Sequence, residues 1–273
     1  MFEHFAHGSA SVRVVRGCSK NICWLGCVLA ALSGSGCGRD LVVGKWSCER
    51  DPDASIADLA VDSPWSTGFE AEFCDYTALA GFCYNSDEAS YKTVESPVHS
   101  GRYAAAFQVR ADPSGYQTRC VRQGKLPTAA YYGAWYFVPE TATNSDNWNL
   151  IHFQGGDPTG PQHGLWDVSL VNGADGALEA IVFDFLSGRV RRAATPTPIP
   201  IGAWFHLEFY LKRAADATGE VALYQDDQLL IRATSLVTDD SDWGQWYVGN
   251  LATRLTPSAS TLYVDDVTIS DTR

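Results

Sequence analysis

The stretch Phe205-His-Leu-Glu-Phe-Tyr-Leu-Lys212 decides the fold, because apolar and polar residues alternate strictly along it. Successive side chains of a β-strand point to opposite faces. One face therefore holds the residues predicted to be buried, which are Phe205, Leu207, Phe209 and Leu211. The other face holds His206, Glu208, Tyr210 and Lys212. This second face either lines a groove or is the solvated side of an outer sheet.

Similar short runs, separated by turn residues, follow one another from Trp65 to the end of the chain. They cover residues 103–110, 133–139, 149–154, 165–172, 178–185, 204–212, 220–224, 228–233, 246–250 and 261–270. Only residues 55–60 are a helix candidate. Many short strands at this spacing predict an all-β sandwich or barrel. We expect one such domain over residues 65–273, since the chain of 273 residues is 45% hydrophobic.

The first 36 residues are predicted to be a signal peptide. Arg13, Arg16 and Lys20 precede an apolar segment at 22–32, and small residues then lead to Cys37. This arrangement resembles a bacterial lipoprotein cleavage site, so Cys37 is a candidate for lipidation. The protein is then an outer-membrane lipoprotein. With a plain signal peptide it is secreted or periplasmic instead.

The residues after the signal are acidic. Removal of residues 1–36, which contain three Lys/Arg and one Glu, lowers the formal net charge from −12 to −14. Residues 37–64 are polar and are predicted to be a flexible tether. A chain with this charge is not expected to bind nucleic acid, and we expect it to reach a membrane only through the lipid anchor. An anionic polysaccharide would need a cleft that is locally basic.

Four cysteines follow Cys37, and an even number in an exported chain suggests two disulfides. Of the three possible pairings, we favour Cys74–Cys83, which closes a short loop, with Cys48–Cys120. Metal binding is the alternative, but these four contain no CxxC pair.

The stretch Trp148-Asn-Leu-Ile-His-Phe-Gln-Gly155 is the best indication of function. Read as a regular strand, it points Ile151 and Phe153 toward the core. Leu150, His152 and Gln154 then share the other face. A His and a Gln side by side on one face indicate the floor of a binding cleft.

Several segments together resemble a known fold family. Gly202-Ala-Trp-Phe-His-Leu-Glu208, Thr218–Leu230 and the closing Leu262-Tyr-Val-Asp-Asp-Val-Thr-Ile269 resemble strands of concanavalin A-like (laminin G-like) jelly rolls. Tyr132-Gly-Ala-Trp-Tyr-Phe-Val-Pro139, followed by 147–155, is similar to polysaccharide lyases of the heparin-lyase or alginate-lyase type. The fold-level likeness covers residues 65–271. It implies a jelly-roll β-sandwich that binds a polysaccharide.

Such lyases cleave uronic-acid polymers by β-elimination, and the likeness implies roles for particular residues here. His152 would be the base or the group that neutralises the carboxylate, and Tyr247 would be the acid. Arg119 and Gln154 would neutralise the substrate carboxylate, and Arg122 would bind it. The family carries a Gln where Leu150 stands and a Tyr where Leu251 stands. These departures leave open whether the protein is an enzyme.

Further binding residues are expected around the His152 strand. His163 and Trp166 flank a Gly-rich loop, and Trp148, Trp166 and Trp243 are candidate platforms for sugar rings, although core packing is the default for such residues. Arg189, Arg191 and Arg192 form the densest basic cluster, which either contacts an anionic ligand or is an ordinary hairpin tip.

The likeness to jelly rolls also raises a calcium site. Their first and last strands often lie side by side, so Glu70 and Asp265 could share a structural Ca²⁺. In a regular strand Asp266 would point away from Asp265. No cofactor is required for the implied reaction.

We therefore expect a monomeric protein that recognises a polysaccharide, with lyase activity on a uronate polymer as the first hypothesis. The alternatives are a non-catalytic carbohydrate-binding module on the cell surface and a scaffold domain without a sugar ligand.

Overall fold

The computed structural model describes residues 42–43, 61, 63–77, 81–110 and 115–273, all within one compact unit. The expected signal peptide, Cys37, Cys48 and the helix candidate at 55–60 lie outside these residues. Within the described part, no helix is long and apolar enough to cross a membrane.

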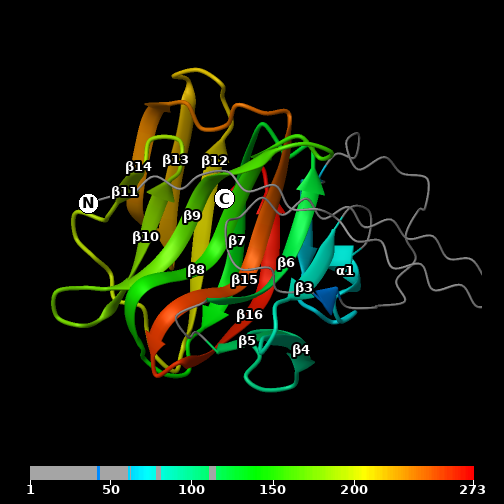
Figure 1. The fold of residues 1–273 in the computed structure, drawn as a ribbon, viewed down its shortest axis with the longest axis vertical. Helices are drawn as coiled ribbons and strands as arrows, with labels where there is room; N and C mark the ends of the chain where they lie inside the picture. The colour runs from blue at the N-terminus through cyan, green and yellow to red at the C-terminus, as the bar shows by residue number, and fades with distance from the viewer. Residues whose placement is uncertain (1–41, 44–60, 62, 78–80, 111–114) are drawn as a thin grey trace, which may run out of the picture. The chain divides into compact units, whose positions relative to one another are not determined.

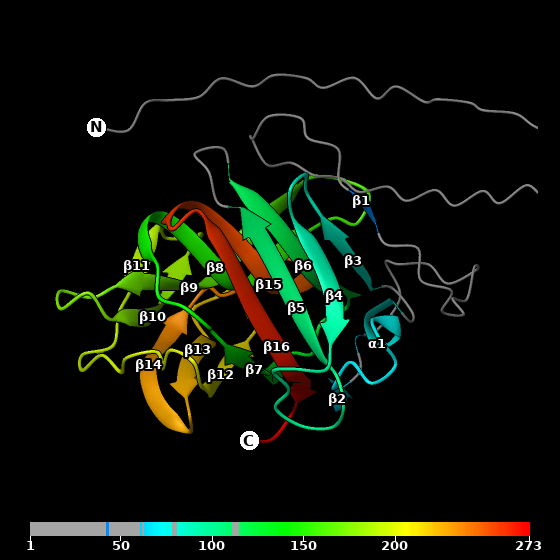
Figure 2. The ribbon, with the colours of Figure 1, turned by 90° about the horizontal axis from the view of Figure 1, so that it is seen from below.

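Two antiparallel sheets make up the fold (Figures 1 and 2). The first sheet has the strand order β1 (Val42–Val43), β3 (Phe82–Asn85), β6 (Tyr116–Gly124), β15 (Trp243–Thr256), β8 (Thr143–Gly156), β9 (Gln162–Asn172), β10 (Leu178–Asp184) and β11 (Arg189–Arg191). The second has the order β14 (Gln228–Leu236), β13 (Gly219–Gln225), β12 (Trp204–Lys212), β7 (Ala129–Phe137), β16 (Ala259–Ser270), β5 (Ala104–Arg110) and β4 (Ser90–Val94), and β2 (Trp65–Thr67) pairs with β16. Only α1 (Cys74–Thr77) is helical in the described chain.

Aromatic side chains from both sheets meet in the core between them. Phe153 of β8 packs against Tyr132 of β7 and Phe209 of β12, with ring centroids 4.9 and 5.4 Å apart. Trp246 of β15 lies 5.1 Å from Tyr132. The predicted β-sandwich is thus confirmed, and the four apolar residues of the 205–212 run are buried as expected. The polar residues of that run lie on the outer face of the second sheet.

The disulfide prediction is wrong. Cys83 of β3 is bonded to Cys120 of β6, its direct partner in the antiparallel ladder, with a Cα–Cα distance of 4.0 Å. This bond excludes both Cys74–Cys83 and Cys48–Cys120. Cys74 is also disulfide-bonded. The sequence could not show that the two strands are neighbours, because 37 residues separate the bonded cysteines.

Part of the segment predicted to be a tether belongs to the domain. β1 adds to the first sheet through pairs with Tyr84 and Asn85 of β3. Val61 is buried, and its amide donates to the Lys125 carbonyl. A flexible tether is therefore wrong for these positions.

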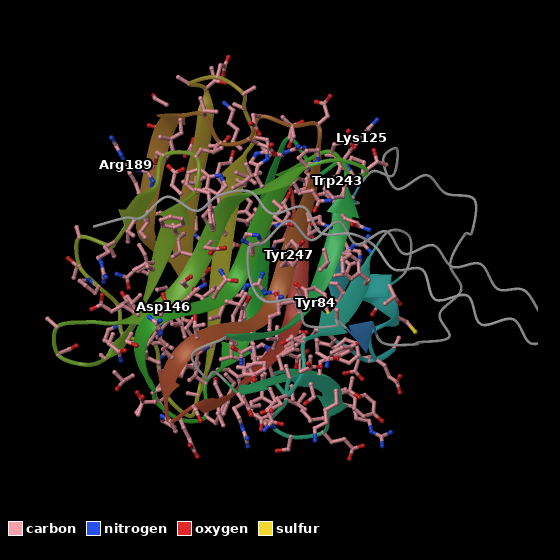
Figure 3. All side chains as sticks on the ribbon, in the orientation of Figure 1. Tyr84, Lys125, Asp146, Arg189, Trp243 and Tyr247 are labelled. Carbon is pink, nitrogen blue, oxygen red and sulfur yellow. A yellow bond between two sulfur atoms is a disulfide. The ribbon has the colours of Figure 1, made fainter. Side chains whose placement is uncertain are left out.

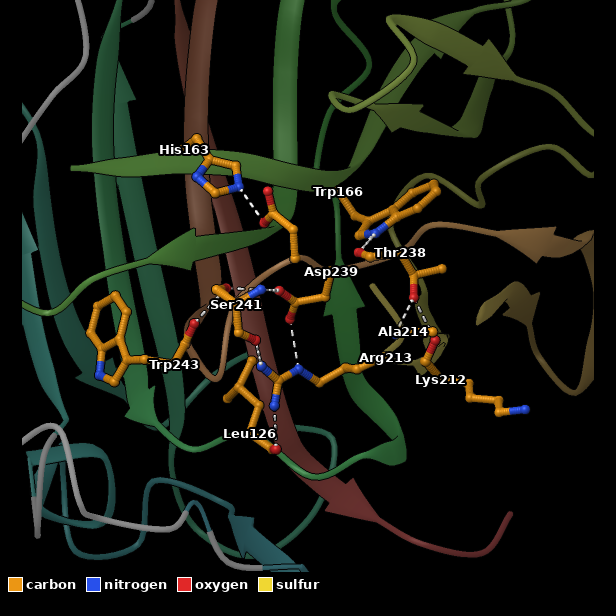
Figure 4. A network of polar contacts seen from close by, with 11 residues as sticks. Leu126, His163, Trp166, Lys212, Arg213, Ala214, Thr238, Asp239, Ser241 and Trp243 are labelled. Atoms are coloured by element: carbon orange, nitrogen blue, oxygen red, sulfur yellow. Dashed lines mark hydrogen bonds and ion pairs between the residues drawn. The ribbon is translucent and has the colours of Figure 1, made fainter. Parts of the chain in front are cut away.

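A buried ion pair fixes the connection that leads into β15 (Figure 4). Arg213 Nε lies 2.6 Å from Asp239 Oδ2, and the same guanidinium donates to the carbonyls of Leu126 and Ser241. The other Asp239 oxygen accepts from the amide and hydroxyl of Ser241. This network joins the end of β12 to the start of β15 and so fixes where β15 enters the first sheet.

Candidate active site

The outer face of the first sheet carries a row of side chains that come from neighbouring strands. Val121, Tyr247, His152 and Asp167 are opposite one another on β6, β15, β8 and β9. Residues that alternate with them, such as Trp246 and Ile151, lie in the core between the sheets. The row therefore points away from the second sheet. Figure 3 shows Tyr247 and Tyr84 near the middle of this face.

A β-bulge in β8 changes the alternation that the sequence predicted. Asn149 pairs with Ser169 and Ile151 with Val168, so two steps along β8 face one step along β9. Leu150 occupies the bulge and is buried in the core, which corrects its predicted place beside His152. Asn149 takes the place on the outer face that the regular pattern gave to Leu150.

His152 is held by a carboxylate. Its Nδ1 lies 2.5 Å from Asp167 Oδ1, and the two side chains are only 12% and 9% exposed. An ionised carboxylate can only accept, so Nδ1 carries the proton and Nε2 keeps its lone pair in the neutral ring. The pair thus presents one nitrogen that is able to take a proton.

Tyr247 stands next to His152, with ring centroids 5.1 Å apart. Its hydroxyl lies 2.6 Å from Gln154 Oε1 and also contacts Gln245 Oε1. A phenol has a single proton, so it donates to one amide oxygen, and the other glutamine must turn its NH₂ toward the phenol oxygen. Burial raises the pKa of Tyr247 well above its ordinary value and the nearby Tyr84 adds to this, while Arg119 opposes it. The phenol is therefore protonated at neutral pH.

Arg119 brings positive charge to the same face. It is 5% exposed, its Nη2 donates to Asn149 Oδ1 at 2.7 Å, and its Cζ lies 5.5 Å from the Tyr247 ring centre. Asn149 also donates to the carbonyl of Ile151. Among the described residues no carboxylate pairs with Arg119, so no described acidic side chain neutralises its charge. Burial raises the pKa of Tyr84, and Arg119 counteracts this.

Four of the predicted site residues thus lie together: His152, Tyr247, Gln154 and Arg119. Sequence reasoning missed Asp167, Gln245 and Asn149. Asp167 and Gln245 alternate with core residues on β9 and β15. Asp167 is only 15 residues from His152, across the β8–β9 hairpin, whereas the pairing of β15 with β8 joins distant parts of the chain. Only the alternation of the Gln245-Trp-Tyr247 stretch could have indicated that Gln245 shares a face with Tyr247.

Arg122 does not belong to this cluster, although the sequence predicted it as a substrate-binding residue. It pairs with Trp246 and points toward the core side. Its guanidinium donates to the carbonyls of Asp75 and Tyr76 in α1 and lies 4.8 Å from the Trp65 ring centre. Because it lies on the core side of the sheet and its guanidinium contacts α1 and β2, it stabilises their packing and is not placed to bind substrate on the outer face.

The predicted aromatic platform at Trp166 is also wrong. Trp166 is fully buried in the main core, where its indole donates to the Thr238 carbonyl, and Trp148 is buried there too. His163 lies near the β8–β9 turn and pairs with Gly155, so it points to the face opposite Gln154. Its Nε2 contacts Asp240 Oδ1 at 2.8 Å (Figure 4). Neither residue adjoins the His152 cluster.

Glu70 and Asp265 hold a loop through its backbone amides. Glu70 Oε1 accepts from the amides of Arg102 and Tyr103, and Asp265 Oδ2 accepts from those of His99 and Ser100. The strand that precedes Glu70 does lie beside the last strand, as expected, because β2 pairs with β16.

A register shift after Asp265 lets both it and Asp266 contact His99, so the expectation of opposite faces is wrong. In the described chain no group of three His, Cys, Asp or Glu side chains is arranged to hold a metal. A calcium ion here stays a prediction.

The fold and this cluster define a jelly-roll sandwich with acid–base and cationic side chains on one sheet. The chain belongs to the polysaccharide lyase family, whose model matches residues 63–268. No functionally curated protein matches the sequence. The predicted likeness to lyases is confirmed, and the lipoprotein expectation stays a prediction.

Solved structures share the fold at low sequence identity. An endo-β-1,4-glucuronan lyase from the fungus Trichoderma reesei is 16% identical with a TM-score of 0.52, over 68% of this chain and 88% of that chain. A cellulose-induced protein is 16% identical with a TM-score of 0.54, over 76% and 97%. An alginate lyase solved with an alginate trisaccharide is 10% identical with a TM-score of 0.55, over 80% and 100%. At these identities the likeness shows the fold alone.

Proposed function

We propose that the protein cleaves a uronic-acid-containing polysaccharide by β-elimination on the outer face of the first sheet. The observation that carries the proposal is a His–Asp pair beside a protonated Tyr, with an Arg that no described carboxylate neutralises. The family match and the fold shared with glucuronan and alginate lyases support the same reaction class.

The first requirement of the reaction is neutralisation of the substrate carboxylate. The C5 proton of a uronate becomes acidic only when negative charge that develops on the carboxylate is stabilised. The positive charge of the Arg119 guanidinium stabilises this developing negative charge, and Asn149 holds the guanidinium in place. Gln245 Nε2 donates to Gln123 Oε1, so Gln154 is the glutamine that turns its NH₂ toward the Tyr247 oxygen. The second hydrogen of that NH₂ can donate to the same carboxylate.

Proton transfer completes the reaction. His152 Nε2 takes the C5 proton, the C5–H electron pair forms the C4–C5 double bond, and the bond from C4 to the glycosidic oxygen breaks. Tyr247 gives its proton to the leaving oxygen and then takes one from solvent. His152 releases the proton that it took from C5 to solvent, which restores both groups. The raised pKa of Tyr247 suits this role, because the acid must be protonated before the bond breaks.

The test is absorbance at the unsaturated-uronate band during incubation with alginate, glucuronan, heparin and pectin. We expect new absorbance with at least one polymer and a loss of roughly 10²–10⁴-fold in His152→Ala. His163→Ala is the matched control, because this residue faces away from the cluster, and it should keep the rate. No absorbance with any polymer would refute the proposal and leave a binding module as the alternative.

Export fits a polysaccharide substrate outside the cell. We include in the proposal a cleaved signal and a lipid on Cys37. Mass spectrometry of the mature N-terminus tests this part separately, because an unmodified end or a different first residue contradicts the lipid anchor.

A further inference from the structure

An exposed aromatic ring adjoins the proposed active site. Phe185 follows β10 and is 42% exposed. A Cβ added to Gly164 of β9 would lie 2.9–3.0 Å from Cγ, Cδ1 and Cδ2 of this ring. Three ring atoms at nearly equal distances mean that the face of the ring, rather than its edge, covers the glycine. One ring face thus rests on the sheet, the residue stays 42% exposed, and any larger residue at 164 would displace the ring.

The turn that carries Phe185 is held by hydrogen bonds to the buried residue that precedes it. Asp184 is buried and accepts hydrogen bonds from the amide and hydroxyl of Ser187. It also pairs with Arg191 Nη2 at 3.0 Å. The Phe185 amide donates to the Leu165 carbonyl. Because these contacts hold the turn in one conformation, little ordering entropy is lost when a ligand binds to the ring.

The ring is continuous with the catalytic row. Its centre lies 5.8 Å from that of His152, at an interplanar angle of 80°. The ring centres of Phe183 and Phe185 lie 4.7 Å apart at an interplanar angle of 85°, and register places Phe183 between Asp167 and the exposed Val190. An apolar strip of Phe183, Phe185 and Val190 therefore extends the row from His152 toward the β11 edge of the sheet.

The same edge carries positive charge. Of the three arginines in this hairpin, Arg191 is paired with Asp184, and Arg192 lies 3.8 Å from Glu179. Arg189 is exposed and has no ion pair among the described residues, and Figure 3 shows it at this edge. Its partner across the hairpin is Asp184, so by alternation it lies on the face opposite Phe183 and Val190. The exposed Phe185 ring therefore matches the apolar C–H face of a sugar residue, and Arg119 on the same outer face matches the carboxylate of a uronate.

We propose that Phe185 is the platform of a sugar-binding subsite, on which a uronate residue flanking the cleaved linkage stacks. This inference rests on the proposed function. It makes the polymer cross the strands from Tyr247 over His152 to the β10–β11 hairpin, and Gly164 is the residue that makes room for the platform.

The experiment compares Phe185→Ala and Phe185→Tyr with wild type in cleavage of alginate and glucuronan. We expect the alanine variant to raise KM roughly ten-fold with kcat changed less than two-fold, because stacking is lost while the proton-transfer groups remain. The tyrosine variant keeps the ring and should keep KM. Gly164→Ala should raise KM too, since its methyl group displaces the ring. Leu229→Ala, an equally exposed apolar residue on the other sheet, is the control.

Retention in native gels that contain either polymer, measured in a His152→Ala background, separates binding from cleavage. Loss of retention in Phe185→Ala supports the subsite even if no product forms with wild type, an outcome in which only the proposed reaction fails. Unchanged KM and retention in Phe185→Ala overturn the subsite while cleavage by wild type stands. If wild type cleaves neither polymer and the His152→Ala protein with its Phe185 intact is not retained by either, both proposals are overturned.

Discussion

Replacing Asp167 by Asn tests whether the His152 pair performs proton transfer, because this change keeps the shape and removes the charge. A hydrogen bond to a charged group is worth about 1.5–3 kcal/mol and a neutral one about 0.5–1.5. The variant should therefore lose about 1–2 kcal/mol in the transition state, where His152 becomes positively charged. At about 1.4 kcal/mol per decade, kcat falls roughly 5- to 30-fold.

The loss is larger if the amide reverses. An Asn that turns its NH₂ toward Nδ1 stabilises the tautomer with its proton on Nε2, which cannot accept the C5 proton, and the fall then approaches about 10⁴-fold. The low exposure of both side chains favours a sizeable effect. The assay is the initial rate of unsaturated product on the best polymer, with the melting temperature measured in parallel.

Asp240→Asn is the matched control. His163 and Asp240 form the same kind of pair at 2.8 Å, but they are 41% and 51% exposed and stand apart from the cluster. This variant should keep its rate within about two-fold, since exposed pairs contribute about 0–1 kcal/mol. Full activity in Asp167→Asn, or an equal loss in both variants, would show that the His152 pair is not the proton-transfer device.

Three further predictions concern stability and pH. Arg213→Ala should lower the free energy of unfolding by about 3–5 kcal/mol and the melting temperature by roughly 6–20 °C, because its buried partner Asp239 loses its counter-charge. Arg232→Ala, which breaks the more exposed pair with Glu220, is the control and should cost under about 1 kcal/mol in the same thermal scan. Replacing Cys83 and Cys120 together by Ala should cost about 4 kcal/mol in denaturant unfolding, and an unchanged midpoint would contradict this. Burial raises the pKa of Tyr247, so its contribution to stability is intact below about pH 10 and is lost at higher pH, when the unfolded chain ionises first. Tyr247→Phe should show a smaller alkaline loss of stability, followed by tyrosinate absorbance.

The sequence was sufficient for the architecture because side-chain alternation is a local property. Every second residue of the 205–212 run is buried as the pattern required. The same rule failed at Leu150, where one inserted residue moves the side chain to the core and gives its place to Asn149. A bulge changes the face of a residue without altering composition, so period-two reasoning cannot detect it.

The partners of the site residues could not be predicted for a different reason. His152, Tyr247 and Arg119 become neighbours only through pairing between strands that are distant in sequence. The local pattern gives each strand two faces but does not say which neighbour stands opposite. Arg122 is an example of this error, because it is three residues from Arg119 and therefore lies on the opposite face, where it contacts α1. The disulfide prediction was wrong for the same reason, since the sequence did not show that Cys83 and Cys120 stand opposite each other.

A net charge of −12 is compatible with an anionic substrate because charge acts locally in salt. At physiological ionic strength the screening length is about 8 Å, so a carboxylate on the outer face of the first sheet responds mainly to the groups beside it. There it meets Arg119, which is buried among tyrosines and amides and is screened less than an exposed cation. The adjoining strip of Phe183, Phe185 and Val190 is apolar. The acidic residues elsewhere then affect how fast the polymer approaches, while Arg119 is the cation that we propose holds a carboxylate beside His152.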